Sequence, residues 1–118
     1  MDNVVSAERF ELRNSAGRTV AVLAPWHDGR PLLQLFDSAG LQRVSLGIDH
    51  NDHPHVSILN ADGQVLVGMG QDQQGVGLNV MDPAGMTAIE LAVHANGERE
   101  LTVRRPDGQV LWTIRSQE

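Results

Sequence analysis

The chain contains no cysteine and very few aromatic side chains. Among its 118 residues there is no cysteine and no tyrosine, and only 3% are aromatic. The missing thiol excludes disulfide bonds, thiolate metal sites and a cysteine nucleophile. Apolar residues never follow one another for more than a few positions. The sequence therefore lacks the run of about 20 apolar residues that a membrane-spanning helix needs.

Clustered positive charge is also missing. The formal net charge is −6, and the nine basic residues are scattered, with Arg104-Arg105 as the densest spot. Binding to a nucleic-acid backbone or to an anionic lipid surface requires clusters of Lys and Arg, so neither partner is expected. The first residues, Met1 to Glu8, have neither the positive nor the apolar region of a secretory signal. We therefore expect a cytoplasmic protein.

A glycine-centred phrase recurs five times along the chain. Its glycines stand at positions 17, 40, 63, 85 and 108, with spacings of 23, 23, 22 and 23 residues. Asn or Asp stands three residues before the glycine in four copies, at Asn14, Asp37, Asn60 and Asp82, and Arg105 takes this place in the fifth. Asx side chains can hydrogen-bond the backbone two residues on, and glycine accepts a positive φ. Each phrase therefore predicts a turn.

On both sides of this turn, apolar residues alternate with other residues. The positions seven and five before the glycine, and four and six after it, are apolar in all five copies: Phe10, Leu12, Ala21, Leu23; Leu33, Leu35, Val44, Leu46; Val56, Ile58, Val67, Met69; Leu78, Val80, Ile89, Leu91; Leu101, Val103, Trp112, Ile114. A period of two is typical of strands with one buried face. No segment has a sustained helical period, so we expect essentially no helix.

Half a repeat later, a second set of turn signals appears at Asp28-Gly29, Asn51-Asp52, Gln74-Gly75 and Asn96-Gly97. Asp-Gly and Asn-Gly pairs favour tight hairpins. The chain is thus expected to alternate strand and turn ten times. The shorter, 22-residue spacing is explained by Val76-Gly77-Leu78, where the next strand begins one residue early.

These observations predict a single domain spanning residues 1–118, all-β, built from five β-hairpin repeats of about 23 residues. An even number of meandering strands places the last antiparallel to the first, and closure removes the exposed sheet edges. We therefore expect a closed antiparallel barrel of about ten strands, with the twenty apolar residues inside. A β-solenoid with 23-residue coils is the alternative, and it requires parallel strands.

Tandem hairpins with the pattern L-x-[DN]-x-x-G resemble the β-flower family of uncharacterised bacterial β-hairpin repeat proteins. This resemblance implies a shallow pseudo-symmetric barrel, similar in fold to the C-terminal barrel of Tubby-like proteins. Arg105 and the Gln42-Arg43 pair depart from the pattern. The chain also lacks the central helix and the basic phosphoinositide pocket of Tubby-like proteins. The resemblance implies no activity, because none is assigned to the family.

The predicted function is a non-enzymatic binding or interaction module without a cofactor. In one version, the barrel lumen holds a hydrophobic or lipid-like ligand. The residues expected to contact this ligand are Leu23, Leu46, Met69, Leu91, Trp112 and Ile114. In the other version, outward apolar residues mediate self-association into a homo-oligomer. These residues are Val20, Val22, Phe36, Leu59, Leu66, Met81 and Leu111.

The alternative function is metal binding or metal-dependent catalysis by the segment from Asp49 to His55. This segment contains His50, His53 and His55 together with two carboxylates, and such side chains can ligate Zn²⁺ or Ni²⁺. A solvated turn between strands explains the same residues, and we favour that interpretation. No nucleophile elbow, phosphate-binding glycine loop or HExxH motif is present, so no catalytic residue is predicted.

Small residues recur seven positions after the repeat glycine, at Ala24, Gly47, Gly70 and Ala92. Glycine within a strand marks a bend or a close approach of backbones. We expect the strands to splay or kink at these positions.

Overall fold

The computed structural model describes residues 3–116, all of whose regular structure is β. Its ten strands are β1 Phe10–Arg13, β2 Thr19–Pro25, β3 Pro31–Phe36, β4 Gln42–Ile48, β5 Pro54–Leu59, β6 Val65–Asp72, β7 Gly75–Met81, β8 Thr87–His94, β9 Arg99–Arg104 and β10 Val110–Ser116. No helix occurs in this described part of the chain, and therefore none that could span a membrane. Four residues of the predicted 1–118 domain, 1–2 and 117–118, lie outside the described residues.

The strands form one sheet in the order of the sequence, from β1 to β10. Every pairing joins consecutive strands and is antiparallel. The predicted ten-stranded meander is therefore confirmed. The β-solenoid alternative was wrong, because it requires parallel strands.

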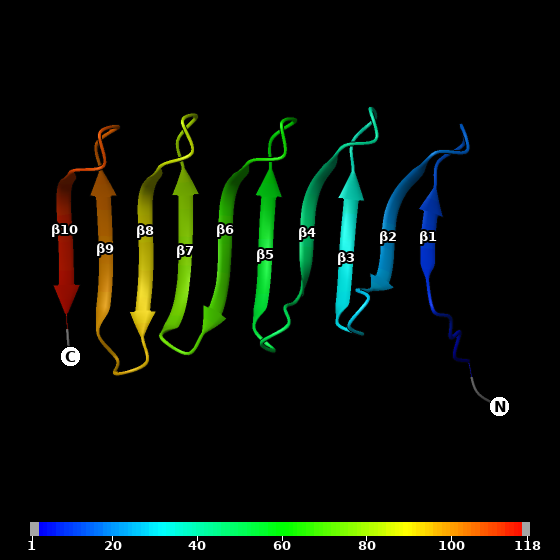
Figure 1. Cartoon of the computed structure of the whole chain (residues 1–118), viewed down its shortest axis with the longest axis horizontal. Coiled ribbons are helices and arrows are strands. Elements are labelled where there is room, and N and C mark those ends of the chain that lie inside the picture. Colours follow the sequence, from blue (N-terminus) through cyan, green and yellow to red (C-terminus); the bar gives the residue numbers. More distant parts are fainter. Residues whose placement is uncertain (1–2, 117–118) are drawn as a thin grey trace.

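The sheet is open, and the predicted closure into a barrel is not present. β1 and β10 form the two edges and lie at opposite ends of the molecule (Figure 1). The molecule measures 52 × 35 × 24 Å along its principal axes. An even strand number permits closure but does not impose it, because closure also needs a suitable tilt and stagger of the strands. The apolar residues that were expected to line a ring-shaped interior therefore lie on one face of an open sheet.

Four of the five glycine hairpins are closed by an Asx side chain, as the sequence predicts. At the second hairpin, the Asp37 Oδ1 atom accepts the N–H groups of Ala39 at 2.9 Å and Leu41 at 3.0 Å. The N–H of Gly40 donates to the Asp37 carbonyl at 3.0 Å, and Gly40 has a φ of 83°. The fifth hairpin keeps the same backbone bonds at Arg105 without the Asx cap.

A β-bulge accompanies each of these five hairpins. The register shifts between Leu12 and Arg13 in β1, and at the equivalent place in the four later hairpins. The shift leaves an extra residue three positions after the repeat glycine. Bulges bend the strand and increase its twist, and in Figure 1 the even-numbered strands from β2 to β8 curve where they leave the turn.

The four turns at the opposite rim also lie where the sequence predicts them. Gly29 and Gly97 adopt φ values of 91° and 88°, and Asp52 takes the equivalent place with a φ of 64°. The β6–β7 turn is one residue shorter, because Asp72 pairs directly with Gly75. This tight turn accounts for the 22-residue spacing.

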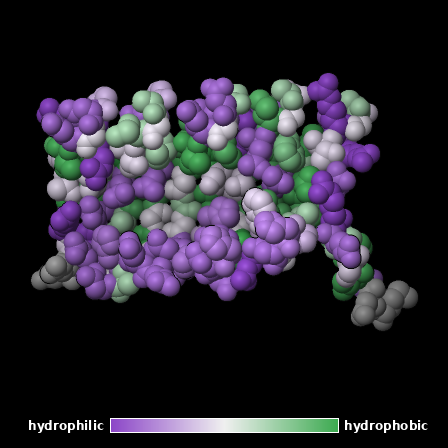
Figure 2. Space-filling view, in the orientation of Figure 1, coloured by the Kyte–Doolittle hydropathy of each residue, from purple (hydrophilic) through white to green (hydrophobic). Residues whose placement is uncertain are grey.

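The two faces of the sheet differ in composition. The register carries all twenty of the alternating apolar residues to one face, which we call the apolar face. The opposite face has a polar central row. The four buried residues of the described chain, Val22, Leu32, Ser45 and Thr102, alternate with the apolar columns and so belong to this opposite face. In Figure 2, the rim at the bottom of the view is largely hydrophilic, whereas the upper rim mixes hydrophilic and apolar residues.

Candidate functional site

The apolar face is built from two ladders of side chains that cross all ten strands. The first ladder pairs Phe10 with Leu23 at one edge and ends with Leu101 opposite Ile114. The second begins with Leu12 opposite Ala21 and ends with Val103 opposite Trp112. Directly opposite side chains on antiparallel strands touch one another. Each ladder is therefore a continuous apolar row.

Nothing in the described part of the chain covers these ladders. Eleven of the twenty side chains are exposed and the other nine are half-buried, so none of them is buried. A ten-stranded antiparallel sheet normally packs one face on a core and leaves the other in water. In residues 3–116 neither face of the sheet is covered by a second layer, and one of these two faces is the one that the sequence makes apolar.

The structure brings the six predicted ligand-contacting residues onto this face. Five of them lie in the first ladder, at Leu23, Leu46, Met69, Leu91 and Ile114. Trp112 lies at the end of the second ladder. Their exposed fractions lie between 43% and 55%. They share a surface as predicted, but this surface is an open face and does not enclose a lumen.

A third apolar row, which our sequence analysis missed, extends the face toward the opposite rim. In this row Pro25 pairs with Pro31 and Ile48 pairs with Pro54. Gln71 interrupts this row on β6, and Val76 and Val93, which are 56% and 48% exposed, continue it toward Arg99 of β9. The sequence signal for this row was the same alternation of apolar residues, which continues for two more residues beyond the first ladder, up to the second set of turns.

Two hollows lie on the apolar face. The first has a volume of about 540 Å³ and is lined by residues of β2 to β7, including Leu23, Leu46 and Met69. The second has a volume of about 430 Å³ and is lined by residues of β6 to β10, including Leu91 and Ile114. Met69 and Val76 contribute to both hollows. The apolar face therefore contains two depressions into which other apolar groups can fit.

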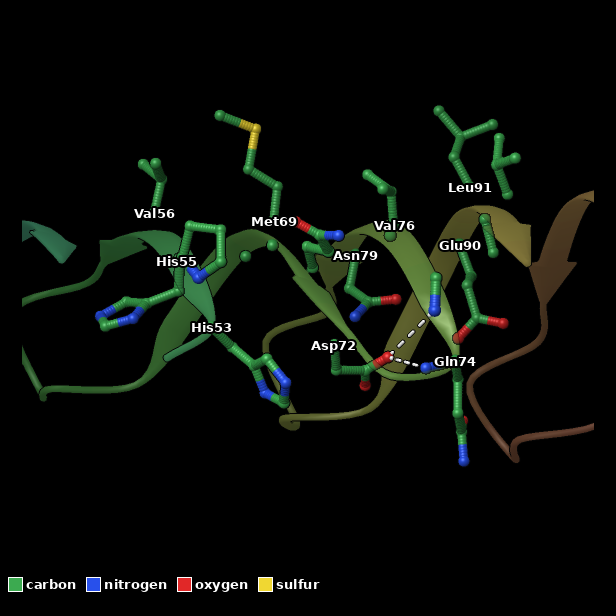
Figure 3. A pocket seen from close by; sticks show the side chains of 18 of the residues that line it. His53, His55, Val56, Met69, Asp72, Gln74, Val76, Asn79, Glu90 and Leu91 are labelled. Carbon is green, nitrogen blue, oxygen red and sulfur yellow. Dashed lines mark hydrogen bonds between the residues drawn. The ribbon is translucent and has the colours of Figure 1, made fainter. Parts of the chain in front are cut away.

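The opposite face carries a polar trough of about 580 Å³ over β5 to β8. Its floor is formed by glycines of β6 and β7, and its walls include His53, Asp72 and Glu90. In Figure 3, Val56, Met69 and Leu91 extend to one side of the ribbon, while Asp72 and His53 lie on the other side. The trough and the apolar face are therefore two distinct surfaces of the same strands.

Two of the small strand residues, Gly47 and Gly70, are explained by close backbone contact. A Cβ atom at Gly47 would lie 2.7 Å from the Pro31 carbonyl oxygen, and one at Gly70 would lie 2.6 Å from the Pro54 carbonyl oxygen. Real Cβ atoms do not approach an oxygen so closely. These glycines thus allow neighbouring strands to come near one another, which is the second meaning of glycine in a strand.

The histidine segment does not converge on a single point. His50 is exposed in the β4–β5 turn, whereas His53 and His55 line the polar trough. The His53 Nδ1 atom lies 4.0 Å from Asp49 Oδ2. The pKa of Asp49 is lowered, mainly because the backbone N–H of His53 donates to its carboxylate. Within residues 3–116, no three His, Asp or Glu side chains are placed to hold a metal ion.

A separate polar network joins β8, β9 and β10 on the opposite face. The Glu100 carboxylate accepts the Thr102 hydroxyl at 2.9 Å, lies 3.2 Å from His94 Nε2 and pairs with Arg115 at 3.5 Å. The Thr102 and Thr113 hydroxyls lie 3.0 Å apart. The hydrogen bond from Thr102, followed by the one with His94, lowers the pKa of Glu100. These groups satisfy one another, and we interpret the network as structural.

The outward apolar residues predicted for self-association make a less open surface. Val22, Phe36, Leu59 and Met81 alternate with the apolar columns and so lie on the opposite face. Val22 is only 4% exposed, whereas Leu111 is 55% exposed. Val22 lies in register between Glu11 and Gln34, whose longer side chains surround it. The large uncovered apolar surface is therefore on the other side of the sheet.

Comparison with models of known protein families and with curated protein sequences finds no match.

Proposed function

We propose that this protein is a non-enzymatic interaction module whose working surface is the apolar face of the sheet. One observation carries the proposal: twenty apolar side chains from all ten strands lie on one face, and none of them is buried. Exposed apolar patches on soluble monomers rarely exceed a few hundred Å², and larger ones mark interaction sites. The face is continuous across the molecule and therefore belongs to the second kind.

The size of the face supports a macromolecular partner over a small ligand. Ten strands about 4.8 Å apart and three rows of side chains span about 43 × 17 Å, or roughly 700 Å² of flat area. Small-molecule sites are concave and bury most of the ligand surface. The two hollows on this face are open depressions and do not enclose a ligand. A second apolar layer fits the surface better than a lipid-like molecule does.

The closed, β-flower-like barrel is the alternative arrangement of the same face. Between repeats, Ile89 pairs with Val103 and Leu91 pairs with Leu101. If β10 met β1 in this register, Trp112 would lie opposite Leu12 and Ile114 opposite Phe10. The apolar face would then become a lumen. A disulfide can separate the two arrangements, because the chain has no cysteine of its own.

The test uses the double variant Leu12→Cys with Trp112→Cys. Directly opposite residues on antiparallel strands have Cα atoms about 4.5–5.5 Å apart, which a disulfide can bridge. We expect no intramolecular disulfide under mild oxidation, as measured by mass spectrometry of the non-reduced protein. The matched control is Val67→Cys with Val80→Cys, a paired position of the same kind between β6 and β7, which should cross-link fully. Quantitative formation of the disulfide between positions 12 and 112 within one chain would overturn the proposal.

A further inference from the structure

We infer that the partner of the apolar face is a second copy of this chain, and that two sheets pack face to face as a β-sandwich. This inference rests on the proposed function and names its partner.

A single sheet without a second layer is an incomplete domain. Stable domains pack a sheet against another sheet or against helices, and residues 3–116 contain no helix. The four buried residues of this part of the chain all lie on the opposite face. Residues 3–116 therefore offer nothing to cover the apolar face. A second copy supplies a layer of the same length and composition.

The area of the face matches that of a stable dimer. The flat area of about 700 Å² per copy corresponds to about 1,400 Å² in total, within the range of specific protein–protein interfaces. Two sheets in a sandwich lie about 10 Å apart, with their inner side chains interdigitated. The two hollows, of about 540 and 430 Å³, give each copy depressions to receive side chains of the other.

The charge distribution permits this association. In the three rows of the apolar face, Arg99 is the only charged side chain among the described residues. Depletion of charge is typical of the centre of an interface, and homodimers use the same patch on both copies. The other charged side chains of residues 3–116 lie outside these rows. An anionic membrane is a poorer partner, because such membranes attract polybasic segments.

The β1 edge of the sheet is a less favourable place for association. β1 has only four residues and carries Glu11 and Arg13, with Arg9 directly before it. Short, charged edge strands oppose pairing with another sheet. Association through the apolar face is therefore favoured over head-to-tail polymerisation, which would pair β10 of one copy with β1 of the next.

The experiment compares the wild-type protein with Met69→Asp and with the control Ser57→Asp. Met69 lies near the middle of the apolar face, in β6, whereas Ser57 lies opposite Gly68 in the central row of the other face. Light scattering coupled to gel filtration should give twice the chain mass of 12.8 kDa for the wild type and for Ser57→Asp. Met69→Asp should weaken the dimer at least about a hundredfold, because it buries an unpaired charge.

A milder pair of variants covers the case in which Met69→Asp fails to fold. Met69→Cys and Ser57→Cys are alkylated with iodoacetamide at increasing protein concentration. We expect the thiol at 69 to become protected as the dimer forms, with the thiol at 57 unaffected by concentration. A dimer that persists unchanged in Met69→Asp, or assembly into longer polymers, would place the contact elsewhere and would overturn the inference.

The failures of the two proposals are distinguishable. A single chain whose thiol at 69 reacts freely at every concentration would refute the second copy but leave the apolar face open to another partner. The other outcome is a monomeric protein in which the thiol of Met69→Cys is protected and the disulfide between positions 12 and 112 forms in the double variant. This outcome would refute both proposals, because the apolar face would then be the interior of a barrel.

Discussion

At the scale of single residues, the turns show how much of the fold is determined by the local sequence. Four glycine hairpins are capped by an Asn or Asp side chain, as at Asp82, whose Oδ1 atom accepts two backbone N–H groups at 2.9 Å. At the fifth hairpin, Arg105 cannot accept these bonds. Asp107 Oδ1 accepts the N–H of Gln109 at 2.9 Å instead. The backbone turn persists because Gly108 has the required φ of 87°.

Arg105→Asp should therefore stabilise the protein. The new carboxylate precedes Pro106, as Asp82 precedes Pro83, so the local sequence would match a turn that is already capped. One added hydrogen bond contributes about 0.5–1.5 kcal/mol, and the low end is expected because Asp107 already serves Gln109. The midpoint of urea denaturation measures the gain. Asp82→Ala is the reciprocal variant and should lower the midpoint. A lower midpoint for Arg105→Asp would contradict this account of the cap.

Gly47→Ala tests the close approach of strands β3 and β4. The new Cβ atom would lie 2.7 Å from the Pro31 carbonyl oxygen, so the strands must move apart, at a cost of about 1–3 kcal/mol. Gly68→Ala is the matched control. Its Cβ atom would meet only Val65 Cγ1 at 3.6 Å, so this variant should be neutral or slightly stabilising. Equal losses in the melting temperatures of both variants would argue against a specific role of the backbone contact.

At the scale of elements, every strand contacts only its neighbours in the sequence. A side chain that contacts residues of three strands is therefore important for stability, because it adds a link that strand pairing alone does not provide. Glu100 is one example, since it lies in β9 and contacts His94 of β8 and Arg115 of β10. Its pKa is lowered chiefly by the Thr102 hydroxyl. The ionised form is thus favoured in the folded protein.

Glu100→Gln should remove a pH-dependent part of the stability. A carboxylate whose pKa is lowered on folding stabilises the protein above its unfolded pKa, and this contribution disappears as the pH falls through the folded pKa. We expect the variant to be less stable than the wild type at pH 7, by about 1 kcal/mol. The difference in the free energy of unfolding should shrink as the pH falls below 4.5, which is the ordinary pKa of a glutamate side chain. Urea denaturation at a series of pH values measures it.

Glu98→Gln is the control for this experiment. Glu98 lies in the same hairpin, and among the described residues its carboxylate takes part in no ion pair. This variant removes a carboxylate of the same hairpin without removing an ion pair, so at pH 7 it should lose less stability than Glu100→Gln does. A Glu100→Gln difference that is constant from pH 7 to pH 3 would show that the Glu100 charge does not matter.

At the scale of the whole molecule, the sequence predicts the strands far better than their closure. The recurring glycines locate the five hairpins, and the period of two assigns twenty side chains to one face. Both expectations are confirmed by the register. The predicted contact residues, from Leu23 to Ile114, do share a surface. Whether that surface is a lumen depends on where β1 and β10 lie, and no repeat carries that information.

The physical reason lies in the range of the interactions. Turn chemistry and strand alternation act over a few residues, so the sequence by itself determined the hairpins, their order and the composition of each face. Closure depends on the sum of small twists, bulges and staggers over nine strand pairs, together with the relative volumes on the two faces. Gly68, Gly70 and Gly77 add no side-chain volume to the face opposite the Met69 side chain. Only the tertiary structure decided that these increments do not bring the edges together, and that the apolar face stays open.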